Sequence, residues 1–370
     1  MAHFTFITWD GGGNVSVALG IGVELLGRGH QVSVLGPESL RPSITDAGLG
    51  FKALGVSPPT DPVARSAYLV EIVGSTSLSA QLPTALAEIQ PDVLVIDCNL
   101  SWALEARTFV PVAVLVHTAL GLYLPVWQPV IDAANEHRHA VGLPPFSAAD
   151  TAWGSRQALL VASLAHFDRA PMPLPSNATY VGMVSRPDRA FPKPQPARQT
   201  LNRPLVLVSY STDPLQNSPA RVQAALDGLA DLPVDVLATT SRTFDAAYLS
   251  VPSNATVVDD VSHTDVMQSA AVVVAHAGHG TTLSALCYGV PLVCVPGIGR
   301  DQVPIAIRVA ELGLGIALIE RASPADIGKA VSTLLSDASI RERMAEFTSR
   351  CGDRAGAATA ADVLESLVPV

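Results

Sequence analysis

The stretch HAGHGTTLSALCYGVPLVCVPGIGRDQ, residues 276–302, combines residue types that together could bind a phosphate. An apolar run precedes it, and a helix is predicted to begin at Thr281 or at the threonine after it. Gly278 and Gly280 let a ligand approach the backbone closely, because glycine carries no Cβ atom. The free amides at the start of a helix favour anions, and His276 can donate a further hydrogen bond. The glycines alone would suit any strand-to-helix corner, but the whole block indicates an anion site.

Three titratable residues in the first half of the chain follow runs that are expected to be strands: Asp10, Asp97 and His117. Open parallel sheets bind ligands at the carboxyl ends of their strands, so these residues are candidates for acid–base chemistry. If the strands before Asp97 and His117 are neighbours, the two residues lie about 5 Å apart, and the carboxylate can orient the imidazole. Two other interpretations stay open: His117 could merely line a pocket, and Asp97 could cap the following helix.

The apolar runs around these residues predict two α/β domains, each with a parallel sheet. Strands are expected at 4–8, 31–35, 92–96 and 112–116, and in the second half at 205–209, 234–239, 255–258, 271–275 and 292–295. The predicted division is a first domain at 1–184, a proline-rich linker at 185–204, a second domain at 205–350 and a C-terminal helix at 351–370. That helix could pack back on the first domain, and a ligand cleft is expected between the domains.

The composition argues against several classes of protein. The 370 residues carry a net charge of −10 and no cluster of lysine and arginine, so no nucleic-acid partner is expected. The four cysteines lack CxxC spacing, which disfavours a metal site or a redox motif. No apolar run is long enough to cross a bilayer and the N-terminus does not resemble a signal peptide, so we expect a cytoplasmic protein without stable membrane insertion.

The sequence GGGN at 11–14 raises the alternative of a nicotinamide cofactor. Gly11 and Gly13 begin a GxG pattern, but Ser16 occupies the position of its third glycine. A Rossmann dehydrogenase is therefore disfavoured. The glycines are better explained as keeping this loop thin, so that a ligand can pass close to the backbone.

The stretch at 276–302 resembles the donor-binding signature of the family 1 UDP/TDP-sugar-dependent, inverting glycosyltransferases, in particular those of the actinobacterial natural-product type. The resemblance covers most of the chain and implies the α/β GT-B fold, in which two Rossmann-like parallel-sheet domains face each other across a cleft. It implies diphosphate contacts from His276, Gly278, Gly280, Thr281, Ser211 and Thr212, nucleobase contacts from Val261 and His263, and sugar contacts from Asp301 and Gln302. Taken alone, Ser211 would equally suit a turn and His263 a helix cap.

The same resemblance raises a question about the catalytic base. The family places its catalytic histidine just after the first strand, where this sequence has Asn14, and asparagine cannot act as a base at neutral pH. Asp97 matches the family's helper aspartate. We therefore hypothesise that His117 and Asp97 form the catalytic dyad, that Asn14 positions the acceptor or the sugar, and that Asp10 is the second candidate for the base.

The acceptor side is expected in the apolar stretch LGLYLPVWQPV at 120–130, where Tyr123 and Trp127 would suit a flat hydrophobic acceptor such as a polyketide. These features and the resemblance together predict the transfer of a sugar to a hydrophobic small molecule. The resemblance implies that the donor is a TDP- or UDP-sugar, that the transfer proceeds with inversion, and that no metal and no other cofactor is needed. The alternatives are a non-catalytic auxiliary protein that binds nucleotide sugars and a nucleotide-sugar 2-epimerase; whether the protein is a homodimer stays open.

Overall fold

The computed structural model describes residues 1–59, 61, 64, 68, 72, 75–104, 109–124, 128–140, 142, 144–145, 153–154, 156–169, 174–184, 203–213, 216–297, 299, 301–352 and 356–369. The chain divides into two compact units, Met1–Asp188 with Arg354–Val370 and Arg189–Asp353. The predicted linker at 185–204 lies outside the described residues except for its last two positions. Within the described ranges, no helix has both the length and the hydropathy that crossing a membrane requires.

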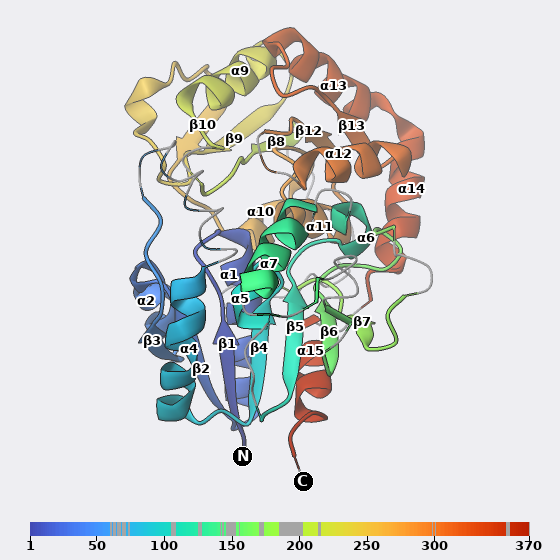
Figure 1. Cartoon of the computed structure of the whole chain (residues 1–370). Coiled ribbons are helices and arrows are strands. Elements are labelled where there is room, and N and C mark those ends of the chain that lie inside the picture. The colour runs from blue at the N-terminus through green and yellow to red at the C-terminus, as the bar shows by residue number, and fades with distance from the viewer. Residues whose placement is uncertain are drawn as a thin grey trace. The chain divides into compact units, whose positions relative to one another are not determined.

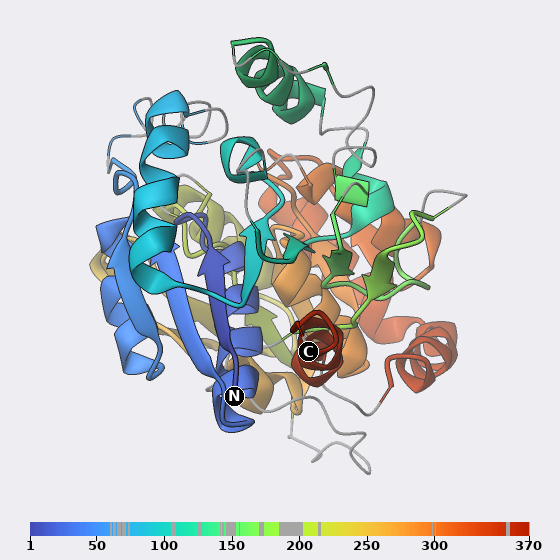
Figure 2. The same ribbon diagram turned by 60° about the horizontal axis from the view of Figure 1, so that its bottom comes forward.

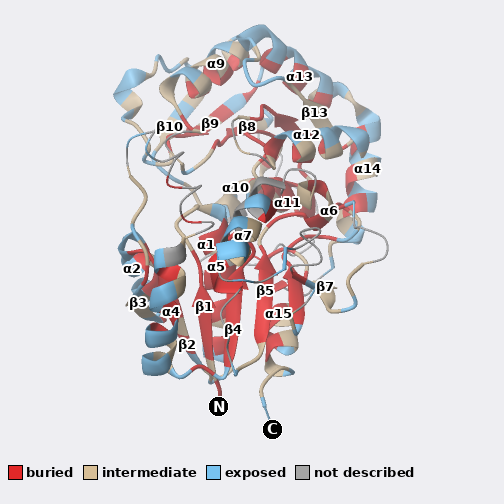
Figure 3. Ribbon diagram, viewed as in Figure 1, coloured by how far each residue is buried: buried red, intermediate tan, exposed pale blue. Residues whose placement is uncertain are grey.

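The first unit is built on a seven-stranded parallel sheet with the strand order β3-β2-β1-β4-β5-β6-β7 (Figure 1). Its strands are β1 (His3–Ile7), β2 (Gln31–Gly36), β3 (Gly50–Ala53), β4 (Val93–Asp97), β5 (Val112–Val116), β6 (Ala158–Val161) and β7 (Ala178–Tyr180). Alternate residues serve two cores: Leu94 and Ile96 pack on one face, whereas Val93 and Val95 pack on the other. This burial on both faces, visible in Figure 3, explains why the central strands read as continuous apolar runs.

Helices cover both faces of this sheet (Figure 2). The larger ones are α1 (Gly13–Gly27), α4 (Thr76–Ile89), α7 (Gln128–Ala140) and α15 (Gly356–Glu365), and the short ones are η1 (Glu38–Leu40), α2 (Arg41–Asp46), α5 (Ser101–Leu104) and α6 (Leu120–Tyr123). α1 and α15 share one core, and α4, α5 and α7 contribute to the other. Arg28 ties the C-terminal helix to the end of α1, because its guanidinium donates to Asp362 and Glu365 at 2.8 Å each.

The second unit is built on a six-stranded parallel sheet with the order β10-β9-β8-β11-β12-β13. Its strands are β8 (Leu205–Val208), β9 (Asp235–Thr239), β10 (Ala255–Val258), β11 (Ala270–Ala275), β12 (Leu292–Cys294) and β13 (Gly315–Ala317). Its helices are α9 (Pro219–Leu229), η3 (Ala246–Tyr248), α10 (His263–Met267), α11 (His279–Cys287), α12 (Gln302–Glu311), α13 (Pro324–Ser336) and α14 (Ala338–Ser349). α9 packs on α13, and α11 packs on α10 and α14.

The two sheets confirm the predicted α/β class with two Rossmann-like units. The strands predicted before Asp97, His117 and His276 are β4, β5 and β11, and each ends within one residue of the predicted position. The helix predicted to begin at Thr281 or one residue later begins at His279, because Gly278 already serves as its N-cap in extended backbone. As a result, the last two residues of the HAGHG stretch, His279 and Gly280, belong to the first turn of the helix.

Candidate active site

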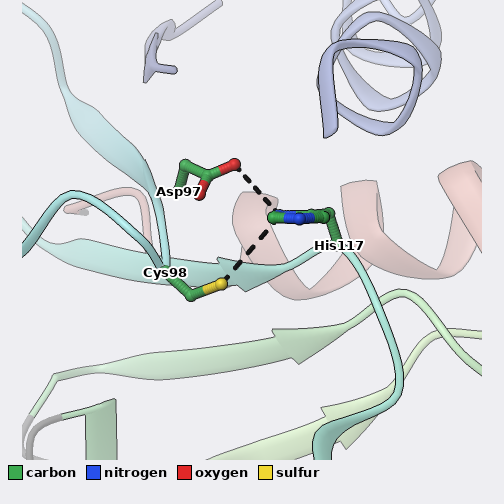
Figure 4. Close-up of side chains that lie close together, drawn as sticks. All are labelled: Asp97, Cys98 and His117. Atoms are coloured by element: carbon green, nitrogen blue, oxygen red, sulfur yellow. Dashed lines mark hydrogen bonds and ion pairs between the residues drawn. The ribbon is translucent and has the colours of Figure 1, made fainter. Parts of the chain in front are cut away.

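His117 and Asp97 lie together at the carboxyl ends of two neighbouring strands of the first unit. β4 and β5 pair in parallel, with Asp97 opposite Leu115, so that both side chains emerge at the same edge of the sheet. The His117 Nδ1 atom lies 3.1 Å from the Asp97 Oδ2 atom (Figure 4). The aspartate side chain is buried, whereas 15% of the histidine side chain remains exposed. The arrangement leaves Nε2 as the imidazole nitrogen that can exchange a proton with another molecule.

The carboxylate of Asp97 is held by three further donors. The Trp9 indole Nε1 donates to Oδ1 at 3.3 Å, and the backbone amide of Asn99 donates to the same oxygen at 3.0 Å. The Asn14 amide Nδ2 donates to Oδ2 at 3.2 Å. A carboxylate fixed by this many hydrogen bonds can orient the imidazole of His117 without itself moving. The sequence interpretation did not single out Trp9 or Asn99, although the spacing of Asp97 and Asn99 is typical of an Asx turn.

Asn14 serves this hydrogen-bond network from a buried position. Only 2% of the residue is exposed, and its Nδ2 atom also lies within hydrogen-bond distance of Thr8 Oγ1 (3.0 Å) and the Trp9 carbonyl oxygen (2.8 Å). The structure thus shows Asn14 holding Asp97. Its predicted contact with an acceptor or a sugar stays a prediction.

Burial and charge act in opposite directions on His117. Burial lowers the pKa of His117, but the negative charge and the hydrogen bond of Asp97 outweigh this, so the pKa lies well above the usual 6.5. The Cys98 Sγ atom lies 3.9 Å from the His117 Nδ1 atom. Burial raises the pKa of this thiol, and the nearby Asp97 raises it further, so the thiol stays protonated at neutral pH. Cys98 therefore contributes little charge to the imidazole.

The same three side chains could in principle offer ligands to a metal. One ligand atom each from Asp97, Cys98 and His117 lies within 4.8 Å of the others. However, the thiol is protonated at neutral pH, and both oxygens of the carboxylate already accept hydrogen bonds. The arrangement therefore suits proton exchange at His117 better than the binding of a cation.

The structure separates the second candidate for the base from this dyad. Asp10 follows β1, and its Oδ2 atom accepts a hydrogen bond from the Ser39 hydroxyl at 2.7 Å. Among the described residues, Asp10 forms no hydrogen bond or ion pair with Asp97 or His117. Its catalytic role stays a prediction, and the geometry favours His117.

The acceptor candidates lie in and after the short helix α6. Tyr123 is the last residue of α6 and packs, half-buried, against the core that Trp9 also contacts. Trp127 lies outside the described residues. The first turn of α6 is fixed by Asp168, whose carboxylate accepts hydrogen bonds at 3.0 Å from the amides of Gly121 and Leu122. The segment that follows His117 is therefore firmly anchored, and an acceptor contact at Tyr123 stays a prediction.

In the second unit, β11 leads directly into the predicted anion site. His276 follows the strand, Ala277 adopts a left-handed backbone with φ of 61°, and Gly278 caps α11. A Cβ atom at Gly278 would overlap the Nε2 atom of His276, so the imidazole packs directly over this glycine. A Cβ atom at Gly280 would meet no atom within 4 Å. The first turn of α11 thus has free space next to Gly280, and the first amides of the helix have no acceptor within it.

His276 is a buried, neutral imidazole. It is 8% exposed, and its Nδ1 atom has no hydrogen-bond partner among the described residues. Burial lowers the pKa of His276 to about 3, with further lowering by the charges of Arg221 and His263. A neutral imidazole keeps one N–H donor and one acceptor nitrogen, and a buried polar atom without a partner is a site where a ligand is expected.

Other residues predicted to bind the sugar donor lie at the carboxyl edge of the same sheet. The Ser209 hydroxyl, just after β8, lies 3.0 Å from the His263 Nε2 atom at the start of α10. The Ser211 hydroxyl accepts from the Asp213 amide at 3.0 Å, which is the turn interaction that its residue type also suits. Of the remaining predicted contacts, Val261 is half-buried, Thr212 is exposed and Thr281 lies half-buried in the first turn of α11. Their contacts with a nucleotide stay predictions.

The predicted sugar contacts lie at the start of α12. Asp301 occupies the N-cap position, and Gln302 is the first residue of the helix. The Gln302 Oε1 atom accepts from the Gly297 amide at 2.6 Å, and its Nε2 atom donates to Gln216. Gln302 therefore holds the loop between β12 and α12 through Oε1 and links it through Nε2 to Gln216, which lies before α9. A sugar contact from Gln302 would have to share these atoms, whereas the contact predicted for Asp301 stays a prediction.

Comparison with known proteins gives matches along the whole chain. Residues 223–368 match the family described as Erythromycin biosynthesis protein CIII-like, C-terminal domain. The chain is 26% identical over 419 residues to the demethyllactenocin mycarosyltransferase of Streptomyces fradiae, with 100% of this chain and 87% of that protein covered. It is 25% identical over 424 residues to the 4'-demethylrebeccamycin synthase of Lentzea aerocolonigenes, with 99% and 100% covered.

A solved structure supports the same fold assignment. The glycotransferase of kitacinnamycin is similar to the chain with a TM-score of 0.81 and 23% sequence identity, and the similarity covers 100% of this chain and 99% of that one. The predicted GT-B fold is confirmed by this likeness and by the two parallel sheets. Together with the family match over residues 223–368 and the curated relatives, these findings show that the chain is a glycosyltransferase, similar over its length to glycosyltransferases of antibiotic biosynthesis.

Proposed function

We propose that this glycosyltransferase moves a sugar from a TDP- or UDP-sugar to a hydrophobic small-molecule acceptor, with inversion at the anomeric carbon. The observation that carries the proposal is the buried, neutral His276, whose Nδ1 atom lacks a partner beside the open first turn of α11. A neutral donor and helix amides form a site for an anion that arrives with its own negative charge.

On the donor side, the chain's own residues would bind the leaving diphosphate. The amides at the start of α11 present hydrogen-bond donors and the positive end of the helix dipole. Charge that develops on the leaving group can be stabilised there without a metal ion, because these donors are fixed before the reaction begins. We therefore propose that catalysis needs no metal and no other cofactor.

On the acceptor side, His117 would serve as the general base. Its neutral form holds a proton on Nδ1, which Asp97 orients, and takes the proton of the acceptor hydroxyl at Nε2. The hydroxyl oxygen then forms a bond to the anomeric carbon while the bond from that carbon to the diphosphate oxygen breaks, and its electron pair leaves with the nucleotide. A single displacement of this kind inverts the anomeric configuration.

One experiment tests the donor, the reaction and the metal independence together. The protein is incubated with TDP- or UDP-sugars and a panel of polyketide and aromatic acceptors, with and without EDTA, and the products are examined by NMR. We expect acceptor-dependent release of TDP or UDP, an inverted glycoside and no effect of EDTA. A changed donor sugar without any acceptor would instead identify an epimerase, and nucleotide binding without turnover of any donor would identify an auxiliary protein.

A further inference from the structure

Arg221 lies across the end of the strand that carries His276. Its Nη2 atom donates to the Val295 carbonyl oxygen at 2.5 Å, and its guanidinium carbon lies 4.9 Å from the centre of the Tyr210 ring. Tyr210 follows β8 and Val295 follows β12, and the sheet places β11 between these two strands. A guanidinium that contacts both residues must therefore lie over the end of β11, where His276 stands. The lowering of the His276 pKa by the charge of Arg221 agrees with this position.

The charge of Arg221 has no carboxylate partner among the described residues. Two other arginines of the second unit have carboxylate partners: Arg308 pairs with Glu311, and Arg343 pairs with Asp337. Arg221 instead contacts a carbonyl oxygen and an aromatic ring, and its Nε atom is buried without a hydrogen-bond partner. Arg221 is partly buried, and even partial withdrawal of a cation from water without a counter-ion is unfavourable, so the folded unit holds a positive charge that an anion can neutralise.

The position of Arg221 in its helix adds to this excess of positive charge. It is the third residue of α9, and the first turn of that helix contains no acidic residue. Helix N-termini disfavour cations, because the amides there already carry partial positive charge. A residue that breaks this local rule is expected at a functional site, where a ligand compensates for it.

We propose that Arg221 is a further donor-binding residue, which supplies the positive charge that neutralises the diphosphate of the nucleotide sugar. The inference rests on the proposed function, because it takes the diphosphate to bind beside His276. The neutral imidazole and the helix amides supply hydrogen bonds, whereas Arg221 supplies the full charge that they lack. A Cβ atom at Gly297 would lie 2.8 Å from Nη1, so the absence of a side chain at Gly297 leaves the space that the guanidinium occupies.

The test compares ligands that differ only in phosphate charge. The dissociation constants of thymidine, TMP and TDP, and of the matching uridine series, are measured by titration calorimetry for the wild type and for Arg221→Gln. We expect the variant to bind the diphosphate about 10- to 100-fold more weakly, the monophosphate less so, and the nucleoside within about twofold of the wild type. An unchanged affinity for the diphosphate, or an equal loss for all three ligands, would overturn the inference.

Two further variants separate charge from structure. Arg343→Gln is the matched control, because Arg343 also donates to a backbone carbonyl oxygen, that of Gly313 at 2.7 Å, but its charge is paired with Asp337. It should leave the affinity for all three ligands unchanged. If Arg221→Gln does not fold, Arg221→Met, which also removes the charge but keeps an unbranched apolar stem, decides: a selective loss for the diphosphate supports the inference, and an unchanged affinity or an equal loss overturns it. A wild-type protein that binds none of the ligands would overturn the proposed function itself, and this inference with it.

Discussion

The Nδ1 atom of His117 lies 3.1 Å from the Oδ2 atom of Asp97, at the carboxyl ends of two paired strands. We propose that this contact supplies the base, an imidazole oriented by a carboxylate, in a chain that has Asn14 where its resemblance to the family leads one to expect a histidine. Asn14 itself donates to Asp97 and so supports the dyad. The chemistry of the acceptor side can therefore be tested at His117 without any assumption about the donor.

Replacing His117 by alanine should abolish most turnover and leave the donor site intact. A general base contributes about 10²- to 10⁴-fold to the rate, so we expect kcat to fall by that factor. The dissociation constant for TDP or UDP should stay within about twofold of the wild-type value, because His117 lies in the first unit and the predicted diphosphate site in the second. Turnover at the wild-type rate in His117→Ala would remove this residue from the mechanism, and Asp10→Asn would then be examined by the same assay.

The activity should depend on pH through His117. The imidazole must be neutral to accept a proton, and Asp97 holds the pKa of His117 well above the usual 6.5. We therefore expect kcat/KM to rise with pH across a range above 6.5 and to level off once His117 is deprotonated. In Asp97→Asn the neutral amide no longer stabilises the imidazolium, so this rise should move to lower pH, with a lower plateau. A rise at the same pH in both proteins would contradict the dyad.

Gly278 and Gly280 offer a matched pair of substitutions in one loop. A Cβ atom at Gly278 would overlap the His276 imidazole, so Gly278→Ala should lower the melting temperature and weaken TDP binding together. A Cβ atom at Gly280 meets nothing, and alanine is the better helix former, so Gly280→Ala should keep or raise the stability, by up to about 1 kcal/mol.

The two variants then separate folding from binding. If the open side of α11 receives the diphosphate, the stable Gly280→Ala protein should still bind TDP more weakly than the wild type, as calorimetry can measure. Undiminished TDP binding by Gly280→Ala would show that no ligand approaches this turn of the helix.

His276 should make the protein sensitive to acid. In the folded state its pKa is about 3, whereas in the unfolded state it is close to 6.5. Between these values the unfolded chain binds a proton that the folded chain does not, so the free energy of unfolding falls as the pH falls from 6.5 towards 3. The expected contribution of this one group is about 1.4 kcal/mol per pH unit.

Urea unfolding of the wild type and of His276→Gln at several pH values measures this contribution. The slope of the free energy of unfolding against pH should be smaller in His276→Gln than in the wild type, by about 1.4 kcal/mol per pH unit. His139→Gln replaces an exposed histidine and serves as the control, with the wild-type slope expected. Equal slopes in all three proteins would show that His276 is not buried in its neutral form.

The central strands were predictable because they are buried on both faces and therefore read as apolar runs, as β4 and β11 do. The strands β3, β7 and β13 are short and only partly buried, and they were not predicted. The contact between His117 and Asp97 could also be predicted, because it depends only on the strands before these two residues being neighbours in the sheet. The contacts of Trp9 and Arg221 could not be predicted, because they depend on the order of the strands in each sheet. Arg221 contacts residues that follow β8 and β12, and it lies near His276 because β11 is placed between these two strands. The hydrogen bond from the Gly121 amide to the Asp168 carboxylate joins residues 47 positions apart, and no local sequence pattern predicts such a pair.

The central claim is that a diphosphate binds at the start of α11 beside His276. The most direct measurement is a crystal structure of the protein with TDP or UDP bound. We expect phosphate oxygens within hydrogen-bond distance of the imidazole of His276 and of the amides in the first turn of α11. A nucleotide bound elsewhere in the protein, with this turn and the imidazole free of it, would contradict the account.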